Sequence, residues 1–261
     1  MLTDLHMAFT LAHCIVAIPL SKLFNHRMPF ATLVIGSMTP DLYRLFSSQS
    51  GEISHQWSGL IYPNFFIGLF FYCIWYFIYK PTWLYFLEIK NDQKPMYSNY
   101  VQQFAFISLG LILGCITHFI WDGLTHADYR TFIFHDILSQ HISIFQKHYA
   151  VHSMLQILSS LASLLFLAFF IYQYKISNLK FKKVKQQDRK IIMSIVFISI
   201  LSGIFNAYLY IQNILPTAFE QHTYYFSGRI FNKFTVGMMV VSLVLCMLFN
   251  FKTYKNATSH L

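Results

Sequence analysis

Apolar residues gather along the chain into long runs that short polar stretches separate. A helix needs about 20 apolar residues to cross a bilayer, and five runs have roughly that length: residues 58–79, 101–121, 151–174, 191–215 and 234–251. Two shorter runs, residues 7–23 and 30–38, come before them and predict a tight hairpin of short helices. The pattern therefore predicts an all-α fold, a polytopic membrane helical bundle with about six or seven membrane segments, the first two forming a short hairpin.

The composition supports this architecture. Hydrophobic residues make up 56% of the 261 residues and charged residues only 11%, whereas soluble domains average about 25% charged residues. A soluble globular domain is therefore excluded. Because a membrane bundle is not divided by the length rules that hold for soluble domains, we expect one integral-membrane helical domain over residues 1–261, with the lipid bilayer as its partner.

The formal net charge of +9 does not indicate a nucleic-acid partner, because the basic residues lie in short stretches between apolar runs, where they act as topology signals. Residues 175–190 carry seven lysines and arginines, which places this stretch in the cytoplasm by the positive-inside rule. Alternating spans then bring seven ionisable residues to the non-cytoplasmic side: His13, Asp41, His55, His118, Asp122, His126 and His152. The sequence identifies no protein partner.

Two of these residues follow the predicted hairpin. Pro40 disfavours helical geometry at Thr39, so we expect the second short helix to end there and to leave Asp41 at the mouth of the bundle. Residues 42–57 are predicted to form a polar loop, and His55 lies close to its end. Asp41 and His55 are thus expected at the outer end of the bundle.

The strongest polar signal is the stretch from His118 to His126, which ends the almost wholly apolar run 104–116. Residues four apart on a helix lie on one stripe, so His118 and Asp122 are predicted to point the same way. His126 continues this stripe if the helix continues. Ionisable groups at membrane depth are costly and usually functional, so we interpret this pair as the centre of a site.

Imidazoles combined with carboxylates are typical ligands of transition metals, whereas Mg²⁺ and Ca²⁺ prefer oxygen ligands almost throughout. Zinc is the first expectation, with manganese or iron as alternatives. Either one metal has three or four ligands, or two metals are bridged by Asp122. Asp41 is also the candidate catalytic base. The candidate metal ligands are His13, Asp41, His55, His118, Asp122 and His126.

Two classes of function remain open. In the first, the protein is a metal-dependent hydrolase that acts on a phosphoester or lipid-derived substrate at the outer face of the membrane. In the second, the protein is not an enzyme, and the buried histidines and aspartates are structural or bind an ion or a proton. A transport path would continue through the bundle, yet residues 191–215 and 234–250 hold few polar side chains. This favours a site that is open to one side.

The order and spacing of the polar motifs also resemble a known family. The motifs are His13 after Phe-Thr-Leu-Ala, the stretch Val-Ile-Gly-Ser-Met-Thr-Pro-Asp at 34–41, Ser54-His55, and Thr-His-Phe-Ile-Trp-Asp-Gly-Leu-Thr-His at 117–126. This pattern resembles a bacterial membrane family catalogued as domain-of-unknown-function family 4184. That family is in turn similar to membrane-bound metal-dependent hydrolases and, more distantly, to zinc-dependent phospholipase C and the S1-type nucleases.

The resemblance implies a protein of the bacterial inner membrane that uses a metal to hydrolyse a phosphodiester or a related ester. Position by position, it carries a ligand role to the six candidate residues named above. The chain departs from the zinc enzymes after His152, where Gln156 stands in place of a glutamate. An amide is a poor metal ligand, so Gln156 is expected to contribute little to metal binding.

Overall fold

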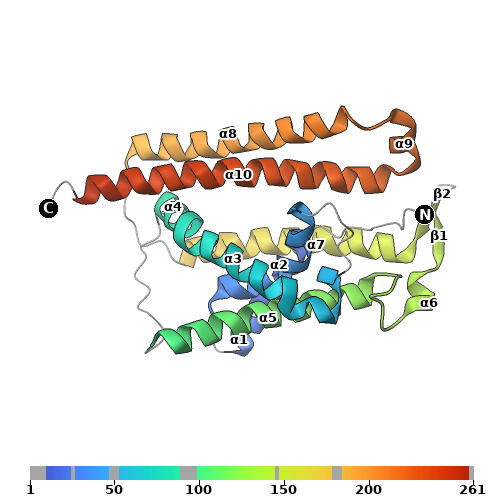
Figure 1. Cartoon of the computed structure of the whole chain (residues 1–261). Coiled ribbons are helices and arrows are strands. Elements are labelled where there is room, and N and C mark those ends of the chain that lie inside the picture. The colour runs from blue at the N-terminus through green and yellow to red at the C-terminus, as the bar shows by residue number, and fades with distance from the viewer. Residues whose placement is uncertain are drawn as a thin grey trace. The chain divides into compact units, whose positions relative to one another are not determined.

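The computed structural model describes residues 10–24, 27–46, 53–88, 99–144, 147–177 and 184–258 (Figure 1). The chain is mostly helical, as predicted. It separates into two compact units, of which the first combines Met1–Tyr72 with Lys94–Tyr172 and the second combines Cys73–Gln93 with Gln173–Leu261. The organisation of residues 1–261 as a single domain stays a prediction.

The described residues contain five helices that are long and apolar enough to cross a membrane, namely Trp57–Phe86, Tyr100–Thr125, Val151–Gln173, Gln186–Ile211 and Tyr225–Thr253. They coincide with the five long apolar runs of the sequence. Large apolar side chains such as Phe166, Phe205 and Leu248 stay exposed along them, which a lipid environment favours and water does not. The protein is therefore an integral membrane protein, and the predicted helical class is confirmed.

The predicted short hairpin is present in the first unit. Its first arm consists of η1 (Thr10–Val16) and α1 (Ala17–Leu23), and its second arm is α2 (Phe30–Phe46). Buried Ala17 and Leu33 pack the two arms together.

The predicted end of the second arm is wrong. Helix α2 continues through Pro40 to Phe46, so Asp41 lies inside a helix and not at its mouth. A proline in a helix interior removes one backbone hydrogen bond, but the packing of α2 along α5 (Tyr100–Thr125) outweighs this local preference. The expected polar loop at 42–57 is correspondingly shorter. Residues 42–46 complete α2, 53–55 form a helical turn, and 47–52 lie outside the described residues.

Helices α2 and α5 approach each other closely at glycines (Figure 1). A Cβ atom added at Gly36 would lie 2.3 Å from the Leu111 carbonyl oxygen, and one added at Gly114 would lie 2.5 Å from the Leu33 carbonyl oxygen. Gly110 and Gly114 are four residues apart, the spacing that lets membrane helices pack backbone against backbone. The glycines thereby set the distance between the two helices that carry Asp41 and His118.

Three short helical turns follow α2 along the chain, and the last two already belong to the first long span, Trp57–Phe86. They are η2 (Ile53–His55), η3 (Trp57–Gly59) and η4 (Leu60–Phe65), and α3 (Phe66–Ile74) follows them directly. The turn η2 carries His55 and is buried at Ser54 and His55. The Asn64 side-chain amide contacts both this turn and α5 and so holds the turn next to that helix.

Between α5 and α7 (Val151–Ser177) the chain forms α6 (His135–Leu138) and an antiparallel pair of strands, β1 (His141–Ile144) and β2 (Lys147–Ala150). The sequence analysis did not predict these strands. Each is only four residues long, which is too short for the alternation of apolar and polar residues to identify a strand.

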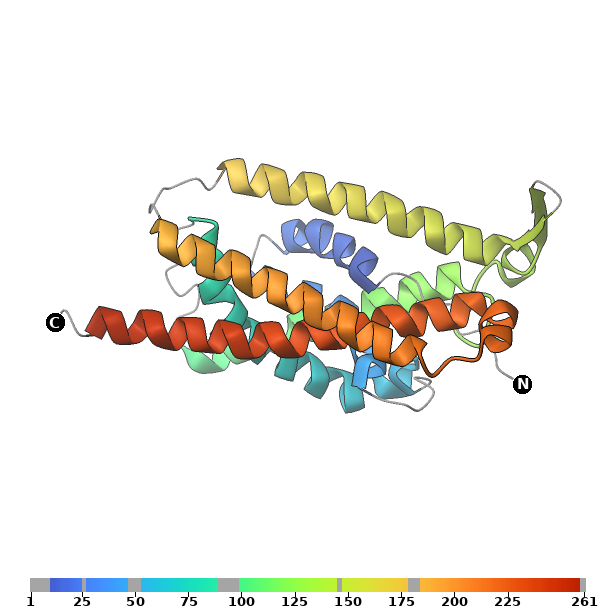
Figure 2. The same ribbon diagram turned by 90° about the horizontal axis from the view of Figure 1, so that it is seen from above.

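The second unit is built from η5 (Trp75–Tyr79), α4 (Lys80–Phe86), α8 (Gln186–Ile211), α9 (Pro216–Gln221) and α10 (Thr223–Thr258). Helices α8 and α10 lie side by side along most of their length (Figures 1 and 2). Polar side chains join α10 to the η5–α4 segment: the Asn250 amide donates to the Ile78 carbonyl oxygen at 2.8 Å, and Tyr79 Oη lies 2.8 Å from Ser242 Oγ.

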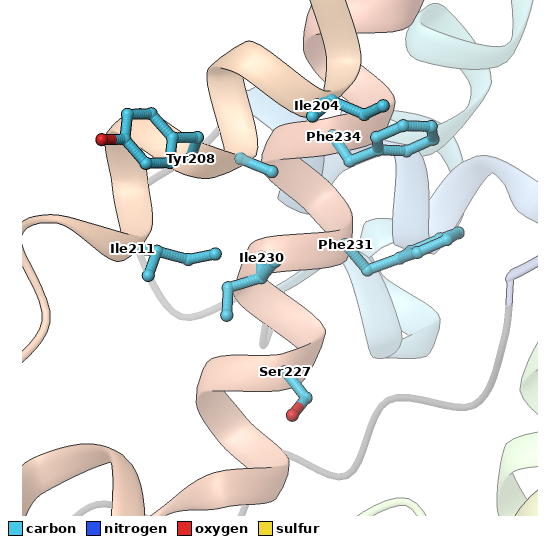
Figure 3. Close-up of a pocket in the computed structure, with 8 residues that line it drawn as sticks. Ile204, Tyr208, Ile211, Ser227, Ile230, Phe231 and Phe234 are labelled. Carbon is cyan, nitrogen blue, oxygen red and sulfur yellow. The ribbon is translucent and has the colours of Figure 1, made fainter. Parts of the chain in front are cut away.

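An open groove of about 670 Å³ lies between α8 and α10 (Figure 3). Its walls are mainly apolar and include Ile204, Ile211, Ile230, Phe231 and Phe234. Among the described residues that line it there is no histidine, cysteine or carboxylate. The described walls of the groove therefore lack the histidine, cysteine and carboxylate side chains that bind metals. The candidate metal ligands lie in the first unit.

Candidate metal centre

Five of the six predicted metal ligands come together in the first unit. They form two buried groups of three, His13–Asp41–His118 and His55–His118–Asp122, and within each group one ligand atom from every residue lies within 4.8 Å of the others. These residues are contributed by four separate elements, η1, α2, η2 and α5. His118 belongs to both groups and is the centre of the cluster.

The backbone of α2 determines which nitrogen of His118 is available. His118 Nδ1 lies 2.8 Å from the Ser37 carbonyl oxygen, and a carbonyl can only accept, so Nδ1 must carry the proton. In the neutral ring Nε2 is then a bare lone pair. It lies 3.4 Å from Asp122 Oδ2 and has no hydrogen-bond partner among the residues that the structure describes. This is the tautomer that a metal-binding imidazole needs.

His55 has the same tautomer for a similar reason. The Ser54 hydroxyl donates its proton to the Pro40 carbonyl oxygen at 3.0 Å, so the Ser54 oxygen accepts from His55 Nδ1, also at 3.0 Å. Burial, followed by the nearby Arg44, lowers the pKa of His55 to about 4, so the ring is neutral near pH 7. Its Nε2 lies 3.2 Å from Asp41 Oδ1. Two lone pairs at this distance need a cation between them, either a proton, which makes the contact a hydrogen bond, or a metal ion.

His13 and Asp41 contribute further buried polar atoms. The His13 ring stacks on His118 with 4.0 Å between ring centroids. Both His13 ring nitrogens and Asp41 Oδ2 lack a hydrogen-bond partner within the described part of the chain. A buried polar group without a partner costs about 1–3 kcal/mol, so these atoms need partners, which buried water or a bound ion can supply.

His126 lies at the edge of the cluster and belongs to neither group of three. Its Nδ1 is 3.2 Å from the Asp122 carbonyl oxygen and 3.5 Å from Asp122 Oδ1. Helix α5 ends at Thr125, and His126 is already extended, with φ −108° and ψ 155°. Its side chain therefore does not follow the helical stripe of His118 and Asp122. A ligand role for His126 stays a prediction.

Gln156 and His152 lie on α7 and are both buried. The Gln156 side-chain amide donates to the Thr125 carbonyl oxygen at 3.0 Å, at the end of α5. Gln156 thus contacts the helix that carries His118 and Asp122. His152 belongs to neither group of donor atoms, and the small contribution of Gln156 to metal binding stays a prediction.

Sequence reasoning missed three charged residues beside the cluster. Arg130 Nη1 donates to Asp122 Oδ2 at 3.0 Å, and its Nε donates to Asp128 Oδ1 at 2.9 Å. Burial alone would raise the pKa of Asp128, but the hydrogen bonds from Arg130 hold it below its usual range. Arg44 Nη1 lies 3.9 Å from Asp41 Oδ1. Arg44 joins the site only because α2 continues past Pro40.

Asn64 positions the turn that carries His55. The buried Asn64 amide donates to the Ser54 carbonyl oxygen at 2.7 Å and lies 3.5 Å from Cys115 Sγ on α5. Asn64 thus holds the η2 turn next to the helix that carries His118. Hydrogen bonds that orient metal ligands in this way affect metal affinity strongly.

We expect the substitution Asn64→Ala to lower zinc affinity roughly 10- to 100-fold, because outer hydrogen bonds to ligand-bearing segments typically contribute that much. A competition titration with a chelator measures it. The matched control is Asn213→Ala, since Asn213 is exposed just after α8 and its side-chain amide donates to the Leu209 carbonyl oxygen. Equal zinc affinity in the two variants would contradict the positioning role of Asn64.

Comparison with known proteins gives one match. The model of the family described as domain of unknown function (DUF4184) matches residues 7–250 and so covers most of the chain, including every candidate ligand. No curated protein and no solved structure matches the chain.

Proposed function

The chain belongs to the family of the domain of unknown function DUF4184, and we propose that it is a membrane-embedded metal-dependent hydrolase of a phosphoester or lipid-derived substrate. The observation that carries the proposal is the buried donor cluster around His118. Nε2 of His118 and Nε2 of His55 each lie within 3.4 Å of a carboxylate oxygen, and His13 and Asp41 add polar atoms without a hydrogen-bond partner among the described residues. Metal ions bound among these atoms would take up their lone pairs.

The donor set fits a transition metal. His55, His118 and Asp122 would hold one ion. His13 and Asp41 offer donor atoms for a second ion, but the single lone pair of His118 Nε2 can bind only one ion at a time. Mixed nitrogen and oxygen donors favour zinc, with manganese and iron as the alternatives. A metal bound there acts as a Lewis acid and makes water a usable nucleophile near neutral pH.

The chain's own residues supply the remaining parts of a hydrolytic site. Asp41 Oδ2 is a buried acceptor with no hydrogen-bond partner in the described ranges, so Asp41 is suited to take a proton from water as a general base. Arg130 donates to Asp122 Oδ2 and limits the orientation of that carboxylate. The Ser37 carbonyl oxygen and the Ser54 hydroxyl hold His118 and His55 in the tautomer that binds metal.

The proposal places the protein in the bacterial inner membrane with the site on the non-cytoplasmic side. Its support is the distribution of basic residues, which is heaviest at 175–190. The substrate would then reach the cluster from the outer leaflet or from the space beyond it.

A second function is favoured by one observation. Arg130 already pairs with Asp122 at 3.0 Å, and Arg44 lies near Asp41, so the protein's own cations neutralise both carboxylates in part. In that case the cluster is a structural network or a proton-binding site, and the protein is not an enzyme. The two functions differ in whether the protein binds a metal.

The deciding experiment is metal analysis of protein purified in mild detergent, as isolated and after Zn²⁺ or Mn²⁺ is offered and the excess removed. The hydrolase proposal expects one or two ions per chain and hydrolysis of a chromogenic phosphoester. The exposed histidine on β2 provides the control, because His148→Ala should bind the same amount of metal. A wild-type protein that remains metal-free under all these conditions would refute the proposal and favour the structural function.

We expect Asp41→Asn to reduce hydrolysis about 10²- to 10⁴-fold, the range that general base catalysis contributes. Metal content should fall less, because the group His55–His118–Asp122 remains intact. Steady-state rates and metal content measured on the same preparation test this. Asp136→Asn is the control, since Asp136 is exposed on α6. A loss of metal as large as the loss of rate would show that Asp41 is a ligand and not the base.

A further inference from the structure

Two buried arginines lie beside the donor cluster, and they differ in their hydrogen bonds. Arg130 donates to Asp128 through Nε and to Asp122 through Nη1. Arg44 is equally buried, at 7% side-chain exposure, but its Nε has no hydrogen-bond partner in the described part of the chain. Its nearest carboxylate oxygen, Asp41 Oδ1, is 3.9 Å away, too far for a hydrogen bond. The Arg130 guanidinium is therefore hydrogen-bonded to carboxylates, whereas Arg44 has one buried donor, its Nε–H group, without a partner in that part of the chain.

A bound metal would give the cluster a net positive charge. Asp41, Asp122 and Asp128 are three carboxylates, and Arg44 and Arg130 are two guanidinium groups. These five charged side chains sum to one net negative charge. A single divalent ion would make the sum positive, and a second ion would make it more so. A buried positive cluster is costly unless an anion joins it.

The chemistry of arginine indicates which anion fits. A guanidinium presents parallel N–H groups in a plane that match two oxygens of a phosphate or a carboxylate. Arg44 follows Asp41 by three residues on α2, so both side chains emerge on one face of the helix. The Arg44 guanidinium therefore lies next to the group of three that contains Asp41, where the reacting part of a substrate would be bound.

We propose that Arg44 binds the phosphate of an anionic phosphoester substrate, so that the site selects phosphoesters over neutral carboxylic esters. This inference rests on the proposed hydrolase function and narrows its substrate class. Arg130 fixes the carboxylates, and Arg44 recognises the substrate. The occupant is either the phosphate of a lipid headgroup or that of a soluble phosphoester, because the two share this chemistry.

The test titrates zinc-loaded protein in detergent with inorganic phosphate, with dihexanoyl phosphatidic acid and with dihexanoyl glycerol, a neutral carboxylic ester, and follows binding by calorimetry. We expect phosphate and phosphatidic acid to bind and dihexanoyl glycerol to bind much more weakly. Tighter binding of phosphatidic acid than of phosphate identifies a lipid headgroup as the source, and equal affinities identify the phosphate group alone. Dihexanoyl glycerol binding as tight as phosphatidic acid binding would overturn the selectivity.

Variants of Arg44 test whether this residue is the one that binds the phosphate. Arg44→Gln should weaken phosphate binding roughly 10- to 100-fold, since a hydrogen bond to a charged group contributes that much. Arg44→Lys keeps the charge but loses the paired donors, so it should be intermediate, and it also serves if the glutamine variant does not fold. Zinc content should be unchanged in both. The control is Arg229→Gln, an arginine of α10 in the second unit.

Different results would refute the Arg44 inference and the hydrolase proposal. Metal-loaded wild-type protein that does not bind phosphate, or an Arg44→Gln variant that binds it as tightly as wild type, overturns this inference and leaves the hydrolase proposal standing. A protein that binds no metal overturns the hydrolase proposal, and the inference with it.

Discussion

Replacing His118 by alanine is expected to abolish metal binding at both groups of donors, because His118 is the residue that they share. Outer hydrogen bonds to metal ligands already change affinity about 10- to 100-fold, so loss of a direct ligand common to both positions should exceed that range. Zinc content after gel filtration and a chelator titration measure the effect. His13→Ala removes a member of only one group and should leave the metal held by His55, His118 and Asp122.

The control for His118→Ala is His148→Ala, which removes an exposed imidazole from β2. Thermal unfolding in detergent must accompany the metal analysis, since His118 also donates to the Ser37 carbonyl oxygen and joins α5 to α2. A folded His118→Ala protein that keeps the zinc content of wild type would show that the cluster is not the metal site. The structural function would then be the better account.

The second large effect is expected at Gly114, where α2 and α5 meet backbone to backbone. In Gly114→Ala the new Cβ would lie 2.5 Å from the Leu33 carbonyl oxygen and 2.7 Å from the Ser37 backbone nitrogen. Neither backbone atom can rotate away, so the helices must separate. Overpacking of this kind destabilises a protein by about 1–3 kcal/mol or more. Separation also moves the Ser37 carbonyl oxygen away from His118, so zinc affinity should fall together with stability.

Gly68→Ala is the matched control for this substitution. A Cβ at Gly68 would lie 3.1 Å from Thr39 Oγ1 and 3.2 Å from Leu111 Cδ2, and both are side-chain atoms that can shift by a few tenths of an ångström. Thermal unfolding and zinc affinity should therefore change little in Gly68→Ala and strongly in Gly114→Ala. Equal behaviour of the two variants would contradict the role of the close helix contact in forming the site.

The membrane architecture could be predicted from the sequence, because the length and apolar character of a span are properties of one contiguous segment. The hairpin and the five long spans follow from this signal. The common direction of His118 and Asp122 also follows, since helical periodicity relates residues one turn apart. Gly110 and Gly114 carry a further readable signal, the spacing of small residues at a helix contact, which would have indicated that α5 packs closely on another helix.

Other features depend on contacts between distant segments. Pro40 locally predicts the end of a helix, but packing on α5 keeps α2 helical to Phe46 and thereby brings Arg44 to the cluster. Conversely, periodicity places His126 on the stripe of His118, but the helix ends one residue earlier. Local preferences of about 1–3 kcal/mol are easily outweighed by the packing of a whole helix.

Composition and periodicity within single segments are enough to establish the class of the protein, its spans and the residue types available for chemistry. How these residues meet depends on the packing of separate segments. The Ser54 hydroxyl and the Ser37 carbonyl oxygen orient the rings of His55 and His118, and Arg130 pairs with Asp122 while Arg44 Nε has no hydrogen-bond partner in the described ranges. Hydrogen-bond partners from separate elements cannot be assigned from a linear pattern, since they exist only once glycine contacts have brought the helices together.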